Sequence, residues 1–334
     1  MKICIAGSAH IRNSEMCSPE WIRALEQERI NSGADIIIAH DSWKQPSLDL
    51  PKEWKVFDYK AQEEELGKDL YESFKQFHKN CSIKNFALWY AYKNNYDVAI
   101  IIDSDCIISP GFVKEHLTAL LIHGDGWHNP LIHHLEVPVY SRGFPYSKRN
   151  LKKWAHMGLW TNEPDLYGSD RVGLEIHPKL KNLHDFPEHV PVSSFFPLSG
   201  MNVSFVREAI PYMLFLPVFH FEGEKFNRHD DIWGGYIFQK IANMKNVSLS
   251  YGLPHVFHNT TVDAEADARE EAAMIKYEDE FYKLVDRAIN HSTTDSEFQH
   301  KHFFSILEKE LRREKKFIPI ADALDYQIKA YSQI

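Results

Sequence analysis

Apolar runs alternate with amphipathic stretches along the first hundred residues. Short runs rich in β-branched residues at 3–6, 36–39, 56–57 and 98–102 predict strands. Apolar residues at helical spacing predict helices over about 19–31, 60–78 and 82–95. This alternation is typical of a doubly wound, nucleotide-binding sheet with parallel strands.

The pattern changes after residue 123. From there to about residue 200, His, Trp, Pro, Gly and aromatic residues crowd the chain without a sustained period, which is typical of functional loops. Helical spacing returns at about 229–243, and the chain after 264 is charged and helical. We therefore predict an α/β domain over 1–262 and a helical extension over 263–334 that packs on it or mediates oligomerisation.

The last of the early apolar runs ends abruptly in Asp103-Ser104-Asp105. Five successive apolar residues predict a strand buried on both faces, and open α/β sheets bind ligands at the carboxyl ends of such strands. Carboxylate oxygens suit Mg²⁺ or Mn²⁺, which usually complete their coordination with substrate phosphates. The alternative is that one Asp caps the next turn, because Pro110 and Gly111 follow closely.

Composition narrows the possible partners. A formal net charge of −9 gives no general attraction for nucleic acid or anionic membranes. The four cysteines form no C-x-x-C pair and fit a reducing compartment, so we expect a cytoplasmic protein. We expect neither a signal peptide nor a membrane span, since no apolar run approaches the required length.

Five ordered blocks carry a family resemblance. They are RGFPYSKR (142–149), GLWTNEPD (158–165), SGMNVSF (199–205), RHDDIWGG (228–235) and GLPHVFH (252–258). With the preceding Asp103-Ser104-Asp105, they resemble the reversibly glycosylated polypeptide, or UDP-arabinopyranose mutase, family. Similarity is thinner before residue 100, and we find none after about 285.

The resemblance implies a fold and an activity. The fold is glycosyltransferase A-like: a Rossmann-like, nucleotide-sugar-binding mixed α/β sheet flanked by helices, with a C-terminal helical extension. The activity is interconversion of the pyranose and furanose forms of a UDP-sugar such as UDP-arabinose, with Mn²⁺ (or Mg²⁺) as cofactor and the possibility of a homo-oligomer. The alternatives are a glycosyltransferase that passes the sugar of UDP to an external acceptor and a self-glycosylating protein.

The resemblance also implies metal ligands, namely Asp103, Asp105 and His258. His255 competes with His258 for the third position. The family usually has three consecutive acidic residues where this chain has Ser104 in the middle. We expect the flanking carboxylates to retain the metal.

Three residues are candidates for catalysis. Arg149 stands where the family has its reversibly glycosylated arginine. A guanidinium stays protonated, so two roles are open: a transient covalent sugar carrier, or a bidentate clamp on the departing diphosphate. Asp230 and Asp231 begin a predicted helix, where they either complement its dipole or manage the proton of the sugar ring oxygen.

The remaining candidates are expected to bind the substrate. They are Arg12, Asn13, Asp41, Lys84, Asp103, Ser104, Arg142, Trp160, Asn162, Gly200 and Asn202. Trp160 either stacks on the sugar or belongs to the core. Gly200 either lets the backbone approach the ligand or serves an ordinary turn.

Overall fold

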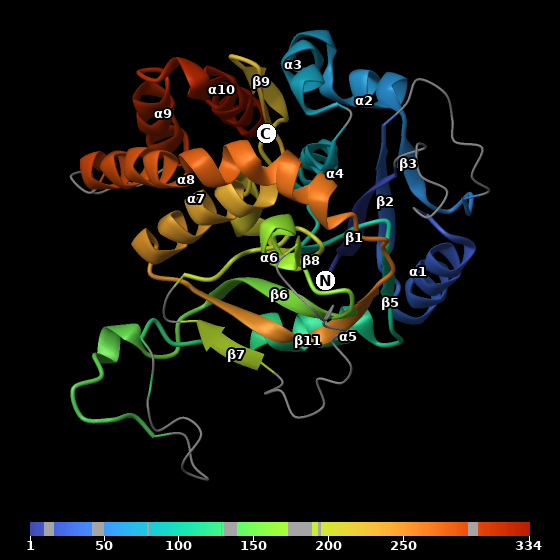
Figure 1. The fold of residues 1–334 in the computed structure, drawn as a ribbon. Helices are drawn as coiled ribbons and strands as arrows, with labels where there is room; N and C mark the ends of the chain where they lie inside the picture. Colours follow the sequence, from blue (N-terminus) through green and yellow to red (C-terminus); the bar gives the residue numbers. More distant parts are fainter. Residues whose placement is uncertain are drawn as a thin grey trace.

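The computed structural model describes residues 1–9, 17–41, 50–78, 80–127, 129, 139–172, 189–192, 195–292 and 300–334. These residues form a mixed sheet with helices on both faces (Figure 1). The sheet has the strand order β3-β2-β1-β4-β8-β6-β11-β5, and β7 pairs with β11. The predicted glycosyltransferase A-like α/β class, with C-terminal helices, is confirmed by this topology.

The strands of the main sheet are β1 (Ile3–Ala9), β2 (Asp35–His40), β3 (Lys55–Phe57), β4 (Val98–Ile102), β5 (Cys106–Ile108), β6 (Lys153–Asn162), β7 (His189–Val192), β8 (Asn202–Val206) and β11 (Ser248–His258). A separate hairpin contains β9 (Phe219–Phe221) and β10 (Glu224–Phe226). Strands β1 to β4 pair in parallel, as the alternation predicts. Strand β8 is antiparallel to β4 and β6, and β6 is parallel to β11.

The helices are α1 (Pro19–Ser32), α2 (Tyr59–Leu66), α3 (Lys68–Phe74), α4 (Lys84–Lys93), α5 (Phe112–Leu121), α6 (Gly168–Val172), α7 (Asp230–Met244), α8 (Ala264–Ser292), α9 (His300–Leu311) and α10 (Ile318–Ser332). The predicted helix over 60–78 is in fact two helices, α2 and α3, followed by a short 3-10 turn. The break falls at Gly67, whose φ of 76° is a left-handed conformation that glycine adopts readily.

Strand β4 is buried on both faces. Val98, Ile100 and Ile102 belong to the core formed with α1 and α5. Ala99 and Ile101 belong to the larger core formed with α4, α7 and the C-terminal helices. This alternation confirms the expectation drawn from the apolar run and fixes the position at which the strand ends.

Strand β6 lies in the segment for which we predicted no regular structure. Its pattern is obscured because polar residues are buried within it. Lys153 is 2% exposed and donates from Nζ to the carbonyl of Ala119 (2.8 Å). His156 is fully buried, with Nδ1 2.8 Å from Oγ of Ser250. The hydrogen-bond partners of these two buried side chains, Ala119 and Ser250, come from other elements of the fold. The sequence around β6 therefore does not show that its polar residues are buried.

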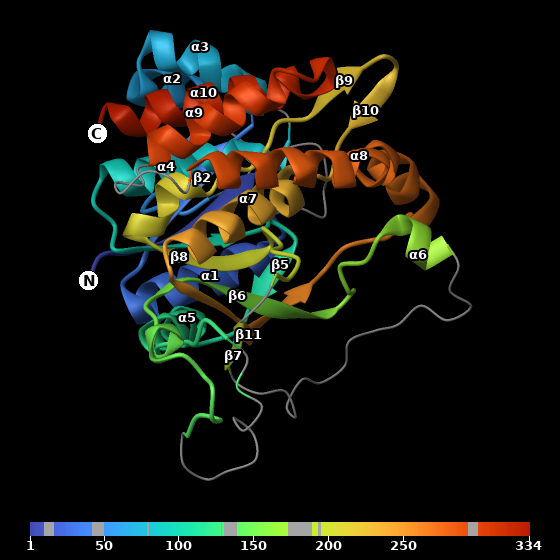
Figure 2. The same ribbon diagram turned by 90° about the vertical axis from the view of Figure 1, so that its left-hand side faces the viewer.

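The C-terminal helices stack on the face of the sheet that α7 covers (Figures 1 and 2). Their apolar side chains join the same core as those of α4 and α7, so the extension packs on the sheet. A domain boundary near residue 262 remains a prediction.

Within the described ranges, no helix combines the length and the apolar character needed to cross a membrane.

His229 occupies an aromatic box next to the start of α7. Its ring centroid lies 5.0 Å from that of Trp233 and 5.6 Å from that of Phe219. Burial lowers the pKa of His229 from 6.5 to about 4. The residue is therefore neutral in the folded protein at neutral pH.

This burial predicts an acid-sensitive fold. As the pH falls below 6.5, the unfolded chain takes up a proton on His229 that the folded chain binds only near pH 4. We expect this residue to remove about 3 kcal/mol from the free energy of unfolding over that range. Urea denaturation across the range should show a shallower pH dependence for His229→Phe. Equal slopes for the two proteins would refute the prediction.

Candidate active site

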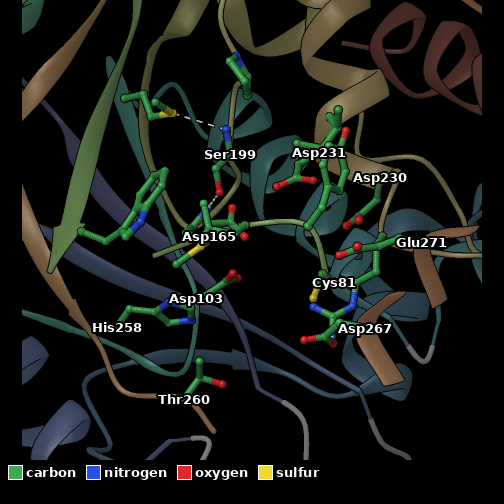
Figure 3. Close-up of a pocket in the computed structure, with 18 of the residues that line it drawn as sticks. Cys81, Asp103, Asp165, Ser199, Asp230, Asp231, His258, Thr260, Asp267 and Glu271 are labelled. Carbon is green, nitrogen blue, oxygen red and sulfur yellow. Dashed lines mark hydrogen bonds and ion pairs between the residues drawn. The ribbon is translucent and has the colours of Figure 1, made fainter. Parts of the chain in front are cut away.

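A cavity of about 900 Å³ lies where β4 ends, lined by residues of the sheet and of helices α7 and α8 (Figure 3). The predicted site residues that line it are Lys84, Asp103, Ser104, Asp105, Trp160, Asp230, Asp231 and His258. The fold thus brings together side chains from distant parts of the sequence, at the sheet edge where α/β proteins bind ligands.

Backbone hydrogen bonds hold the Asp103-Ser104-Asp105 turn. Trp21 donates from Nε1 to the carbonyl of Asp103 (3.0 Å), and the amide of Cys17 donates to the carbonyl of Ser104 (2.9 Å). Ser104 is only 4% exposed. The turn is therefore anchored from the α1 side, and both carboxylates reach the cavity.

Lys84 is buried next to Asp103. Its ammonium forms an ion pair with the Asp103 carboxylate and donates to the carbonyl of Gly200 (3.2 Å). Burial alone would lower the pKa of Lys84, but the charge of Asp103 raises it well above its ordinary value. Lys84 thus stays protonated and restrains Asp103.

Asp105 faces His258. Oδ2 of Asp105 lies 3.7 Å from Nε2 of His258, and Nδ1 of His258 is 2.9 Å from the carbonyl of Glu163. Burial would raise the pKa of Asp105, but the hydrogen bond and the positive charge that His258 offers when its ring is protonated lower it below its ordinary value. A carboxylate and an imidazole nitrogen directed at one point suit a divalent cation.

The protein itself supplies few ligands at this point. In the part of the chain that the structure describes, no three or more His, Cys, Asp and Glu side chains are grouped as a metal site. Asp105 and His258 face each other and could hold a cation between them, whereas Lys84 engages Asp103. This arrangement fits Mn²⁺ or Mg²⁺, because these ions commonly take their other ligands from water and substrate phosphates.

Three more carboxylates, those of Asp165, Asp230 and Asp231, line the cavity (Figure 3). Oδ2 of Asp231 accepts a hydrogen bond from the amide of Gly200 (2.8 Å). Burial, followed by repulsion from Asp230 and Asp165, raises the pKa of Asp231 to about 8. Partial desolvation by the surrounding protein also raises the pKa values of Asp165, which is exposed by surface area, and of half-buried Asp230. At neutral pH, Asp231 therefore carries a proton in a site rich in carboxylates.

The family model for reversibly glycosylated polypeptides matches residues 20–334. The chain belongs to this family. The match continues beyond residue 285, where the sequence blocks showed no similarity.

UDP-arabinopyranose mutase 1 of Oryza sativa subsp. japonica is 24% identical over 249 residues, which cover 70% of this chain and 67% of that protein. UDP-arabinopyranose mutase 3 of Arabidopsis thaliana is 26% identical over 192 residues, which cover 54% of this chain and 52% of that protein. Among solved structures, glucosyl-3-phosphoglycerate synthase from Mycobacterium tuberculosis, in complex with Mn²⁺ and uridine-diphosphate-glucose, is 14% identical with a TM-score of 0.43. That alignment covers 82% of this chain and 76% of the other.

In this reversibly glycosylated polypeptide, Arg149 is not among the residues that line the cavity. Its guanidinium carbon lies 3.9 Å from the ring centroid of Tyr146 and 4.3 Å from that of Tyr140. Nη2 donates to the carbonyl of Phe144 (2.8 Å). Arg142 is exposed in the same segment and does not line the cavity either.

Two predicted asparagines have partners inside the protein. Asn202 is fully buried and donates from Nδ2 to the carbonyls of Leu159 (3.1 Å) and Pro254 (2.9 Å). Asn162 donates from Nδ2 to the carbonyl of His258 (2.9 Å). Neither side chain lines the cavity.

The other predicted residues lie in different surroundings. Asp41 follows β2 and accepts a hydrogen bond from the hydroxyl of Tyr59. His258, and not His255, lines the cavity. Gly200 brings its backbone to both Lys84 and Asp231, although it does not itself line the cavity. Arg12 and Asn13 lie outside the described residues.

The structure adds cavity residues that we did not predict. Arg228 forms an ion pair with Asp267 (2.7 Å) where α8 begins, and Glu271 lies one turn further on. Asp165 and Arg228 stand within the resemblance blocks, which could have suggested them. Asp267 and Glu271 are four residues apart and so share a helix face, but only the packing of α8 shows what that face contacts.

Proposed function

We propose that this chain is a metal-dependent UDP-sugar enzyme, most specifically a mutase that interconverts pyranose and furanose forms of a UDP-sugar such as UDP-arabinose. The observation that carries the proposal is that a single cavity combines the Asp105–His258 pair with the carboxyl groups of Asp165, Asp230 and Asp231. The names of the relatives support the same activity.

The fold suggests how the substrate lies. Open α/β sheets bind nucleotides at the carboxyl ends of their parallel strands, and Ser8 of β1 and Ser104 line the cavity there. The diphosphate would then lie beside Asp105 and His258, which would hold the cation. A cation bound there would neutralise the negative charge that grows on the diphosphate as its bond to the sugar breaks.

The sugar would face the remaining carboxyl groups. Changing the ring size moves a proton between sugar oxygens while the anomeric carbon is separated from UDP. Asp231, protonated at neutral pH and held by the Gly200 amide, can donate that proton. A neighbouring carboxylate, Asp230 or Asp165, can accept one. Lys84 keeps Asp103 in place beside them.

One feature supports a glycosyltransferase as the second candidate. The cavity continues along α7 and α8 to an aromatic end, where the ring centroids of Tyr236 and Tyr282 are 4.0 Å apart. Phe195 lies 5.3 Å from Tyr236 and is 42% exposed. Aromatic side chains suit ligands with both apolar and polar surfaces, so an acceptor sugar could occupy this end.

A product assay separates the two candidates. The purified protein would be incubated with a panel of UDP-pentoses and UDP-hexoses and Mn²⁺, with and without saccharide acceptors, and its products separated by chromatography. We expect pyranose and furanose forms of one UDP-sugar to interconvert without an acceptor. Turnover only when an acceptor is present would identify a transferase.

The role of Arg149 remains a prediction and is tested separately. If Arg149 carries the sugar, incubation with the UDP-sugar should add one sugar mass to its peptide, and excess UDP should remove it. If Arg149 clamps the diphosphate, no adduct should form, but Arg149→Lys should lose much of the rate because an ammonium cannot replace a bidentate fork. Wild-type turnover by Arg149→Ala would refute both roles.

A further inference from the structure

The last residue of β6 and the first residue after it each contact His258. We infer that Asn162, Glu163 and Arg171 form a clamp that fixes the His258 imidazole with Nε2 directed at Asp105. The inference rests on the proposed function, in which His258 would bind the divalent cation. It assigns these three residues a positioning role that is separate from substrate contact.

The first contact holds the backbone of His258. Strands β6 and β11 are paired in parallel up to Asn162 and His258, which are opposite each other in the register. Asn162 adopts a left-handed conformation (φ 70°) there, and its Nδ2 donates to the carbonyl of His258 (2.9 Å). The Asn162 side chain thus adds a hydrogen bond at the point where the two strands end.

The second contact holds the ring. Nδ1 of His258 is 2.9 Å from the carbonyl of Glu163, and a carbonyl can only accept a hydrogen bond. Nδ1 must therefore carry the proton, which in the neutral imidazole leaves the lone pair on Nε2. Nε2 is the atom that lies 3.7 Å from Asp105. Protein-bound metals commonly depend on this kind of support for a ligating histidine.

Arg171 locks the loop in turn. Its side chain is 4% exposed, with Nη1 3.3 Å from Oε2 of Glu163. Nη2 donates to the carbonyl of Pro164. Arg171 thus binds the side chain of Glu163 and the next residue's carbonyl, so the peptide that accepts from His258 is held on both sides. A buried ion pair on its own is weak evidence that it stabilises the fold. The Arg171–Glu163 pair, however, adjoins the carbonyl that accepts from His258, so it can act by holding that carbonyl in place.

Because the backbone at Asn162 is left-handed, its side chain can be removed without changing the backbone conformation. Asn162→Gly keeps the conformation, since glycine adopts positive φ readily, and removes only the amide. Arg171→Lys keeps the charge but cannot reproduce the fork between Glu163 and Pro164. Asn95→Gly is the matched control, because Asn95 is also left-handed (φ 56°) and is exposed in the turn before β4.

Two readouts test the clamp without an activity assay. Nitrogen-15 NMR of the metal-free protein reports the tautomer of His258, and electron paramagnetic resonance reports Mn²⁺ affinity in the presence of UDP. Wild type and Asn95→Gly should show the Nδ1-protonated ring. Asn162→Gly and Arg171→Lys should show mixed tautomers and about 10- to 100-fold weaker Mn²⁺ binding.

The outcomes separate the clamp from the metal site. If both clamp variants retain the wild-type tautomer and Mn²⁺ affinity, the clamp is refuted and the metal site stands. If wild type binds no Mn²⁺ but the variants still change the tautomer, the clamp stands and the metal requirement of the proposed function fails. Thermal unfolding of each variant shows whether it is still folded. If either Asn162→Gly or Arg171→Lys is unfolded, the tautomer and the Mn²⁺ affinity of the other variant decide whether the clamp exists.

Discussion

Replacing Asp105 by asparagine is expected to abolish metal-dependent UDP binding and turnover. The substitution keeps the shape of the side chain but removes the negative charge that faces His258. Loss of a residue that only supports a ligand typically weakens metal binding about 10- to 100-fold, so losing a ligand should cost more. Isothermal titration of UDP with Mn²⁺, and with excess chelator, measures the effect.

The matched control is Asp69→Asn. Asp69 is an exposed carboxylate on α3 that does not line the cavity. The Asp69→Asn protein should bind UDP and Mn²⁺ as wild type does. Equal UDP affinity for Asp105→Asn and wild type, or no effect of chelator on wild type, would show that the metal assignment is wrong.

Replacing Asp231 by asparagine is expected to reduce turnover by a factor of about 100 to 10,000, the usual contribution of a positioned acid or base. Asparagine can still accept from the Gly200 amide but cannot exchange a proton. In wild type, turnover should also decline as the pH rises through about 8, because Asp231 then loses its proton. Initial rates of UDP-sugar isomerisation across this range provide the measurement.

The same substitution should affect stability in the opposite direction. The pKa of Asp231 is raised from 3.8 to about 8 on folding, so its contribution is complete below pH 3.8 and is lost as the pH rises through 8. Asp231→Asn should therefore be more stable than wild type at pH 9. Glu20→Gln, which removes an exposed carboxylate from the first turn of α1, controls for the helix dipole. If Asp231→Asn turns over as fast as wild type, the Asp231 carboxyl does not exchange a proton with the sugar and only complements the dipole of α7.

The sequence predicted the parts of the fold in which local pattern and burial agree. Strand β4 has the predicted bounds because its five apolar residues are buried on alternate faces. Strand β6 could not be predicted in the same way. Its buried Lys153 and His156 are polar residues whose partners come from α5 and β11. The pattern therefore resembles an irregular segment until the fold supplies those partners.

The site shows the same division. The position of Asp103 and Asp105 followed from a strand end, which is a local feature. The pairing of Lys84 with Asp103 depends on the packing of α4, which local pattern does not specify. A resemblance between sequences also cannot tell a residue that touches the ligand from one that holds the backbone. Asn202 stands in a matched block, yet its side chain donates to the carbonyls of Leu159 and Pro254, and its Oδ1 lies 2.8 Å from Nε2 of His116.

Positional isotope exchange tests the central claim most directly. A UDP-sugar would carry oxygen-18 in the bridge between the sugar and the diphosphate and would be incubated with Mn²⁺ and the protein alone. Because a mutase must release UDP from the anomeric carbon and return it, the label should move to non-bridging positions at least as fast as the ring isomerises. A label that stays in the bridge while the ring changes size, or that moves only when an acceptor is added, would contradict the mutase.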